Sequence, residues 1–559
     1  MNNPKTRILK QRIGQLVIFC GPLTTFLVNP WSNYDPIGLI KLVSISSFGF
    51  GILFLLVFKS QQVINEIPKI LMSASLAFVL CMVSTILFSG APINQQIWGS
   101  FGRNTGFVTY ISLISILVGA VVAASKEFYA RLLNVFVYSS LLMTAYCTIQ
   151  FLKLDPIKWS EQGVFGTLGN INFLSAYFGM TSLSILALIL GKGLTRKMSL
   201  FLGLKVLWDL FLVASTKSIQ GLVLFAAGLV FLGFLLVRRL GKYWILGYSL
   251  LSFVALYFTI LGLLNKGPLA RFLFQTSVVF RGDYMHAGFV MTLKKPLFGV
   301  GMDSYGDWYR EVRGQISTLR TGPDRISNTA HNIFLDISSN GGIPLFLCYL
   351  ALNLFVLFSI IQMLKRYKKI DTVFMALATT WFGYLVQSVA SINQIGIGIW
   401  GWIFSGAVIG YSRLFNFNPQ SLTQKNPRKL PKTAVVLDPL EALTLYAGLA
   451  LGLIVSLIPL RADAAFRAAN DRRDAVKIKA ATEMLGSTSF HSELFLDFTM
   501  RNNLVSEVKP TAIRITEKYP RDFFAWRVLS VASESTTQER NQALERAKAL
   551  DPFNPQLKN

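Results

Sequence analysis

The sequence predicts an all-α membrane protein that crosses the bilayer many times and ends in a soluble helical tail. Hydrophobic residues make up 52% of the 559 positions, charged residues make up only 15%, and the mean hydropathy is +0.49. A soluble domain normally has about a quarter charged residues. Long apolar runs also alternate with short basic clusters along most of the chain. Most of the protein is therefore expected to contact lipid.

The apolar runs set the expected number of transmembrane helices. Runs of about 18 to 25 residues are each long enough to cross a bilayer core of roughly 30 Å. We expect about thirteen transmembrane helices, at residues 13–30, 37–57, 69–89, 106–124, 131–151, 170–190, 199–215, 220–237, 243–264, 342–363, 372–391, 396–415 and 441–460.

The basic residues predict the orientation of these helices. The formal net charge of +26 could suggest a nucleic-acid partner. The Lys and Arg residues, however, lie in short clusters between apolar runs, such as residues 365–369, and are not interleaved with exposed aromatic residues. We interpret them as topology signals and expect no nucleic acid. With the N-terminus in the cytoplasm, the positive-inside rule places the polar stretch 265–341 and the tail outside the inner (plasma) membrane.

Four regions follow from these patterns. Residues 1–264 and 342–461 are predicted transmembrane regions, 265–341 a long extracytoplasmic loop, and 462–559 an extracytoplasmic helical tail. The tail segment ALERAKALDPFNP resembles the second helix and turn of a tetratricopeptide repeat. Only one or two degenerate copies occur where a stable solenoid usually needs at least three, so a plain helical tail stays an alternative. We expect His491, in this tail, at the surface.

The long loop contains a predicted helix. Phe280, Tyr284, Ala287 and Met291 recur at helical spacing within residues 271–294, and the pattern ends before Pro296. The following stretch, PLFGVGMDSYGDWY, is expected to be rich in turns and has no nucleotide-binding pattern around its glycines.

Arg281 lies near the start of this predicted helix, one residue away from its apolar stripe. His286 lies about 140° around the helix from Arg281, so the two side chains do not share a face. An arginine alone is more often structural than functional.

His331 is the candidate general base of the loop. Ser327 or Asn328 can cap a helix that has His331 in its first turn. The helix dipole would then favour a neutral imidazole, which can accept a proton from an attacking hydroxyl or amine, and free backbone N–H groups could hold a phosphate oxygen. A lone loop histidine is more often a surface or packing residue. Arg103 and Lys217 lie in short outer loops, where basic residues are uncommon unless they snorkel to the interface or bind something.

Several motifs together resemble one family. The segments RGDY (281–284), PLFGVGMDSY (296–305) and His331-Asn332, followed by Gly342 at the head of a helix, are similar to the O-antigen ligase and O-antigen polymerase superfamily. Bacterial protein O-oligosaccharyltransferases also belong to this superfamily. The upstream segments FGRNTGFVTY (101–110) and GTLGNINFLSAYFG (166–179) agree with it. The resemblance covers roughly residues 100 to 415.

The resemblance implies a GT-C-like membrane glycosyltransferase that uses an undecaprenyl-diphosphate-linked glycan as donor on the outer face of the inner membrane. By the family pattern, His331 activates the acceptor and Arg281 binds the diphosphate. A second family arginine is missing from STKSIQGLVLF (215–225), where Lys217 could supply the charge and Gln220 a hydrogen bond. Leu345 also stands where the family often has Gly, Thr or Tyr.

Arg103, Asn332 and Tyr284 complete the predicted substrate contacts. Charge that builds on the leaving diphosphate can be stabilised by basic side chains alone, and the acidic residues of the loop form no D-x-D pair, so we expect no metal and no cofactor.

The acceptor stays open from the sequence. It is a lipid-linked core in a ligase, another lipid-linked repeat unit in a polymerase, or a protein hydroxyl in an oligosaccharyltransferase. A transporter is the rival class, but the second half of the chain does not repeat the first, which disfavours it.

Overall fold

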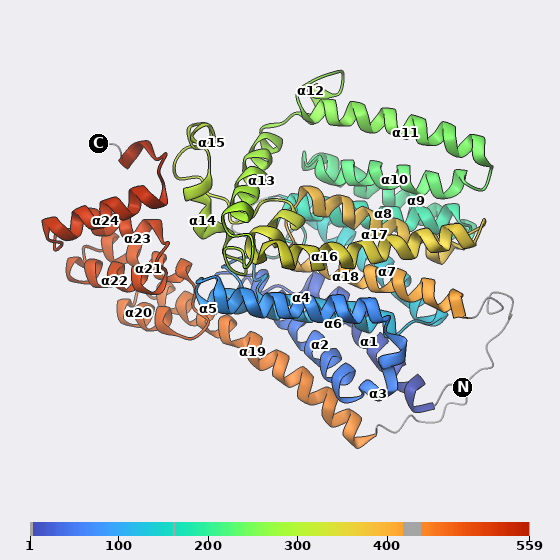
Figure 1. The fold of residues 1–559 in the computed structure, drawn as a ribbon, viewed down its shortest axis with the longest axis horizontal. Helices are drawn as coiled ribbons and strands as arrows, with labels where there is room; N and C mark the ends of the chain where they lie inside the picture. Colours follow the sequence, from blue (N-terminus) through green and yellow to red (C-terminus); the bar gives the residue numbers. More distant parts are fainter. Residues whose placement is uncertain (1–3, 160–162, 418–437, 558–559) are drawn as a thin grey trace.

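The computed structural model describes residues 4–159, 163–417 and 438–557, and in these ranges every regular element is a helix (Figure 1). The predicted all-α fold class is therefore confirmed. Each of the thirteen expected apolar segments overlaps one of these helices.

Eleven helices in the described ranges are long and apolar enough to cross a membrane, which confirms a polytopic membrane protein. Two further helices overlap the remaining expected segments: α1 (Pro4–Phe26), and α6 (Phe107–Val122), which is only 16 residues long. The exact number of thirteen stays a prediction. The eleven helices are α2 (Gly38–Phe58), α4 (Lys69–Phe88), α7 (Lys126–Phe151), α8 (Ile171–Leu190), α9 (Arg196–Ser215), α10 (Gln220–Val237), α11 (Lys242–Leu263), α16 (Ile333–Arg366), α17 (Thr372–Ala390), α18 (Ile395–Phe417) and α19 (Pro439–Asp471).

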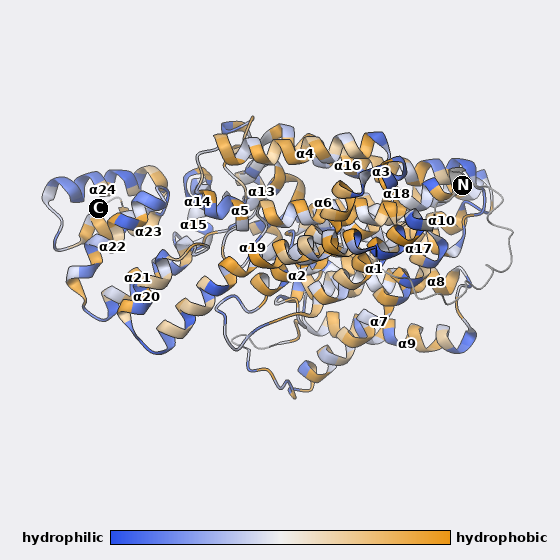
Figure 2. Ribbon diagram, turned by 90° about the horizontal axis from the view of Figure 1, so that it is seen from below, coloured by the Kyte–Doolittle hydropathy of each residue, from blue (hydrophilic) through white to orange (hydrophobic). Residues whose placement is uncertain are grey.

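The long helices lie side by side in one bundle (Figure 1), and most of their residues are hydrophobic (Figure 2). Helix α19 packs along α2 through two glycines one turn apart. A Cβ atom at Gly448 would lie 2.6 Å from the Phe50 carbonyl oxygen, and one at Gly452 would lie 2.2 Å from that of Ser46. Small residues at this spacing let two backbones approach closely. Because α19 runs on into the tail, this contact also anchors the tail to the bundle.

The stretch 265–341 is mostly helical. It contains α12 (Ala270–Leu273), α13 (Thr276–Lys294), α14 (Tyr305–Val312), α15 (Gln315–Thr321) and the start of α16. The predicted helix is present as α13, with Tyr284, Ala287 and Met291 buried and Phe280 partly buried against them. The expectation of turns throughout 296–309 is wrong at its end, because α14 begins at Tyr305. Tyr305, Tyr309 and Val312 form a buried face of α14, and burying this face stabilises the short helix.

Helix α16 has a kink at Gly342, whose φ of 76° is left-handed. A Cβ atom there would lie 2.5 Å from the Leu297 carbonyl oxygen, so only glycine fits. The kink separates a short helix that belongs to the loop from the long apolar helix that follows.

The tail lies beyond one end of the bundle (Figure 1), and each of its helices packs against the one before. Its similarity to tetratricopeptide repeats stays a prediction. The expectation that His491 lies at the surface is wrong: the side chain is buried, because α21 packs against the end of α19. The tail helices are α20 (Ala475–Glu483), α21 (Ser489–Arg501), α22 (Val505–Lys518), α23 (Phe523–Val531), α24 (Thr537–Leu550) and the short η3 (Pro555–Leu557).

Candidate active site

Helix α13 supplies one wall of the site. It runs across the direction of the long helices (Figure 1) and carries Arg281 and Tyr284, which lie three residues apart and therefore on one face. The Tyr284 ring is buried, 5.7 Å from the Tyr309 ring in an edge-on arrangement. The Tyr305 hydroxyl donates to the Tyr284 carbonyl oxygen at 2.6 Å. Helix α14 thus holds α13 in place at this point.

His331 packs on this wall, with its ring 5.1 Å from the Tyr284 ring. The predicted position in the first turn of a helix is wrong, because His331 immediately precedes Asn332, the N-cap of α16. The Asn332 Oδ1 atom accepts from the N–H groups of Phe334 and Leu335, at 2.9 and 3.1 Å. Asn332 was predicted to bind substrate, and its oxygen is already used in this cap.

The two residues expected to cap the helix have other partners. The Ser327 hydroxyl donates to the Thr329 carbonyl oxygen at 2.8 Å, and Asn328 accepts from Arg103. These hydrogen bonds fix the conformation of the segment that precedes His331. His331 itself has a left-handed φ of 52°, which is uncommon for a residue other than glycine.

The His331 imidazole has no hydrogen bond to any residue that the structure describes. Burial lowers its pKa to about 3, and the positive charges of Arg103 and Arg281 contribute to this shift. The direction agrees with the neutral ring expected from the sequence, although its causes are burial and two guanidinium groups. A neutral imidazole with free nitrogens can accept a proton from a bound hydroxyl.

Arg281 contacts Gln220, a pairing that the sequence placed in one substrate site. Arg281 Nη2 donates to Gln220 Oε1 at 3.0 Å. Gln220 is the first residue of α10 and is only 5% exposed, and its Nε2 has no partner within the described residues. Lys217 is exposed and lies in the turn between α9 and α10, three residues ahead of Gln220. A guanidinium, an unpaired amide N–H and a helix N-terminus together favour an anion.

Arg103 approaches His331 from a different part of the chain. It lies between α5 (Ile93–Trp98) and α6, and its Nε and Nη2 donate to Asn328 Oδ1 at 3.2 and 2.9 Å. The structure thus brings together His331, Tyr284, Arg281, Gln220 and Arg103, all of them predicted site residues. His286 is exposed on α13 and does not join them.

Sequence reasoning missed two buried aspartates that shape the site. Asp303 Oδ2 accepts from the N–H groups of Ser100 and Thr105, at 2.8 and 3.1 Å, and so holds the Arg103 turn. Burial raises the pKa of Asp303, although Arg103 and these donors oppose the shift. Asp336 Oδ1 accepts from the Ala330 N–H at 2.6 Å, next to His331. Both residues stood in the sequence as scattered acids, and only their buried backbone partners reveal their role.

A family model described as O-antigen ligase matches residues 204–350. The match includes His331, Arg281, Gln220, Lys217 and Tyr284, whereas Arg103 lies outside it. No curated protein matches the chain. Members of the matched family are glycosyltransferase-like ligases and polymerases, which act on lipid-linked glycan donors and their acceptors. Residues 204–350, which carry the candidate site apart from Arg103, are therefore similar to the O-antigen ligase family, and they belong to a polytopic membrane protein.

Proposed function

We propose that the protein is a GT-C-like glycosyltransferase of the inner membrane. It transfers a hexosyl or oligosaccharyl group from an undecaprenyl-diphosphate-linked glycan to an acceptor hydroxyl on the outer face. The observation that carries this proposal is the His331 imidazole, which has no hydrogen bond to any described residue and whose pKa burial lowers, in the same site as the paired Arg281 and Gln220. General base and anion site are thus on neighbouring elements of one domain.

In the proposed reaction, His331 accepts the proton of the acceptor hydroxyl while its oxygen attacks the anomeric carbon of the donor sugar. The bond between that carbon and the diphosphate oxygen breaks, and its electron pair leaves on undecaprenyl diphosphate. His331 afterwards returns its proton to the departing phosphate or to water. No other reactant is needed for this balance.

The leaving diphosphate needs charge stabilisation that grows along the reaction. Arg281 and the Gln220 amide N–H are the proposed main contacts, with Lys217 three residues ahead of Gln220 and Arg103 close enough to His331 to lower its pKa. One preorganised donor of this kind typically contributes about 2.7 to 4 kcal/mol to the transition state. Tyr284 and Asn332 are proposed to contact sugar from the α13 wall and from the head of α16.

The distribution of Lys and Arg supports the proposed topology, with a cytoplasmic N-terminus and the site outside. The proposal divides the chain into transmembrane helices at 1–264, an extracytoplasmic catalytic loop at 265–341, further transmembrane helices at 342–461 and an extracytoplasmic tail at 462–559. Membrane lipids surround the two helical parts, and the donor approaches from among them.

A reconstituted assay tests this function. His331→Ala and Arg281→Ala are placed in proteoliposomes that hold undecaprenyl-diphosphate-linked glycan, and both donor consumption and glycosylated product are measured. His286→Ala is the matched control, because this histidine is exposed on the same helix as Arg281. We expect the first two variants to lose transfer and the control to keep it.

Normal transfer by folded His331→Ala and Arg281→Ala proteins would disprove the assignment. Offering a lipid-linked core, a second lipid-linked glycan and a Ser- or Thr-containing exported protein in parallel then identifies the acceptor, since intact mass shows which one gains the glycan.

A further inference from the structure

The C-terminal tail is bound to α14 through a buried ion pair. Arg313 follows the last residue of α14, and Asp551 follows the last residue of α24. Arg313 Nη2 donates to both carboxylate oxygens of Asp551, at 2.9 and 2.7 Å, and both side chains are fully buried. Arg310 Nη1 adds a further contact to Asp551 at 3.1 Å. One carboxylate of the tail therefore holds two guanidinium groups of the loop.

A tail arginine, Arg521, also contacts α14. The guanidinium carbon of Arg521 lies 3.5 Å from the centroid of the Trp308 ring, and its Nε donates to the Asp307 carbonyl oxygen at 3.2 Å. Arg521 also forms an ion pair with Glu311. Together with Asp551, these contacts attach both ends of α14 to the tail.

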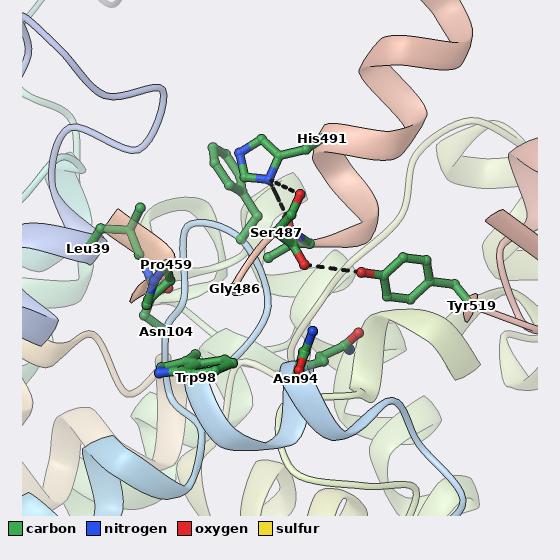
Figure 3. Close-up of a pocket in the computed structure, with 13 residues that line it drawn as sticks. Leu39, Asn94, Trp98, Asn104, Pro459, Gly486, Ser487, His491 and Tyr519 are labelled. Atoms are coloured by element: carbon green, nitrogen blue, oxygen red, sulfur yellow. Dashed lines mark hydrogen bonds between the residues drawn. The ribbon is translucent and has the colours of Figure 1, made fainter. Parts of the chain in front are cut away.

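The tail also contacts the turn that carries Arg103. The ring of Phe490, in α21, stacks on Phe101 with a centroid distance of 3.9 Å and an interplanar angle of 15°. Phe101 lies two residues ahead of Arg103. Figure 3 shows the adjoining narrow pocket, where His491, Ser487 and Tyr519 of the tail lie across from Trp98 and Asn104.

His491, next to Phe490, links α21 of the tail to α19 of the bundle. Its Nδ1 accepts from the Thr488 N–H at 3.2 Å, and its Nε2–H donates to Asp463 Oδ1 at 3.0 Å. The other Asp463 oxygen accepts from the Tyr34 N–H at 2.8 Å. The tail is thus joined to the membrane helices by buried polar bonds as well as by α19.

A buried ion pair points to a geometric role more than to added stability. Desolvating two charges offsets most of their attraction, and an apolar pair of the same size is often as stable. The pair, however, tolerates only a narrow range of positions for α14. Tyr309 of α14 packs on Tyr284, and Tyr284 packs on His331, so the position of α14 reaches the proposed general base through two ring contacts.

We propose that Asp551 is a positioning residue for glycosyl transfer, and that the tail holds α14 and the Arg103 turn in register around His331. This inference rests on the proposed function. It makes residues 462–559 a supporting wall of the active site, although they lie outside the matched family domain.

The test uses Asp551→Asn in the full-length protein, which keeps the size of the side chain and removes its charge. We expect kcat to fall roughly tenfold to a hundredfold, since a misplacement of about 1 Å can have an effect of this size, while KM for the donor changes much less. We also expect the acid limb of the kcat/KM profile to move to higher pH, because a loosened α14 lets water reach His331. Asp551→Glu should recover part of kcat.

Asp497→Asn is the matched control, because Asp497 pairs with the exposed Arg501 on the same tail. Phe490→Leu tests the stacking of Phe490 on Phe101. This variant also tests the proposal if Asp551→Asn does not fold. Its expected effect is again a shifted acid limb, now through the Arg103 turn.

The proposal would be overturned if both Asp551→Asn and Phe490→Leu kept the kcat per folded molecule and the acid limb of the wild-type protein. This holds also if the variants only lower the amount of folded protein. Transfer that persists in His331→Ala would instead refute the proposed function itself, so the two failures are distinguishable.

Discussion

Gln220 allows the charge of Arg281 to be tested without changing the size of either side chain. Gln220 Oε1 accepts a hydrogen bond from Arg281 Nη2 at 3.0 Å, and the side chain is 5% exposed. Gln220→Glu replaces this neutral acceptor by a carboxylate of the same shape. The new carboxylate pairs with Arg281 and repels an incoming diphosphate, so we expect glycan transfer to fall.

The size of the effect follows from the geometry. Two unit charges about 4 Å apart interact by about 4 kcal/mol at an effective dielectric constant of 20. The carboxylate then cancels most of the electrostatic attraction between Arg281 and the diphosphate of the glycan donor. We expect kcat/KM to fall by about 100- to 1000-fold, the range seen when one hydrogen-bond donor of this kind is lost. Gln220→Met removes only a hydrogen bond, with an expected loss of about 1 kcal/mol, or roughly fivefold.

The assay measures initial rates of transfer in proteoliposomes over a range of donor concentrations, with thermal unfolding of each variant in parallel. The wild-type protein, Gln220→Glu and Gln220→Met are compared under the same conditions. Equal losses in the two variants would refute the argument, because the charge of Arg281 would then be irrelevant to donor binding. A more active Gln220→Glu protein would refute it as well.

Three further outcomes are expected. Because burial, Arg103 and Arg281 lower the pKa of His331 to about 3, kcat/KM should show no acid limb near pH 6.5, and Arg103→Met should raise the pH at which the limb appears. Burial raises the pKa of Asp307 to about 7, above an ordinary value near 3.8, so the folded state binds its proton more tightly than the unfolded state. The contribution of Asp307 to the free energy of unfolding is fully present below about pH 3.8 and is lost as the pH rises through 7. Asp307→Asn should lack this loss of stability in thermal unfolding measured across that pH range. At pH 8 the variant should be more stable than the wild-type protein by up to about 4 kcal/mol. Gly452→Val adds side-chain atoms where a Cβ alone would lie 2.2 Å from the Ser46 carbonyl oxygen, so α19 should separate from α2 and the melting temperature should fall. Gly203→Val is the control and should leave the melting temperature unchanged, because a Cβ atom at Gly203 would meet no described atom within 4 Å.

The part of the site that could be predicted is carried by local patterns. The apolar stripe of α13 repeats every three or four residues, so its core residues and the place of Arg281 follow from spacing alone. His331 stood out because histidine is rare in this chain, and Gly342 because it precedes a long apolar run.

The cap at Asn332 could not be chosen over Ser327 or Asn328 by the same reasoning. All three residue types cap helices well, and the choice depends on partners elsewhere. Arg103, far away in the sequence, binds Asn328, and this leaves Asn332 to cap α16. The burial of His491 could not be predicted either, because its hydrogen-bond partner Asp463 lies on another helix.

By itself, the sequence determined that this protein is an all-α polytopic membrane protein and pointed to a polar segment near residue 331 as the candidate site, because hydropathy, helical periodicity and charge bias are properties of neighbouring residues. Only the tertiary structure decided which distant side chains meet there. In the folded protein Arg281 contacts Gln220, and Asp303 binds the backbone of the turn that carries Arg103. The tail contacts α14 through the ion pair of Asp551 and Arg313. Contacts between residues far apart in the sequence depend on how the helices pack, and no local pattern records that packing.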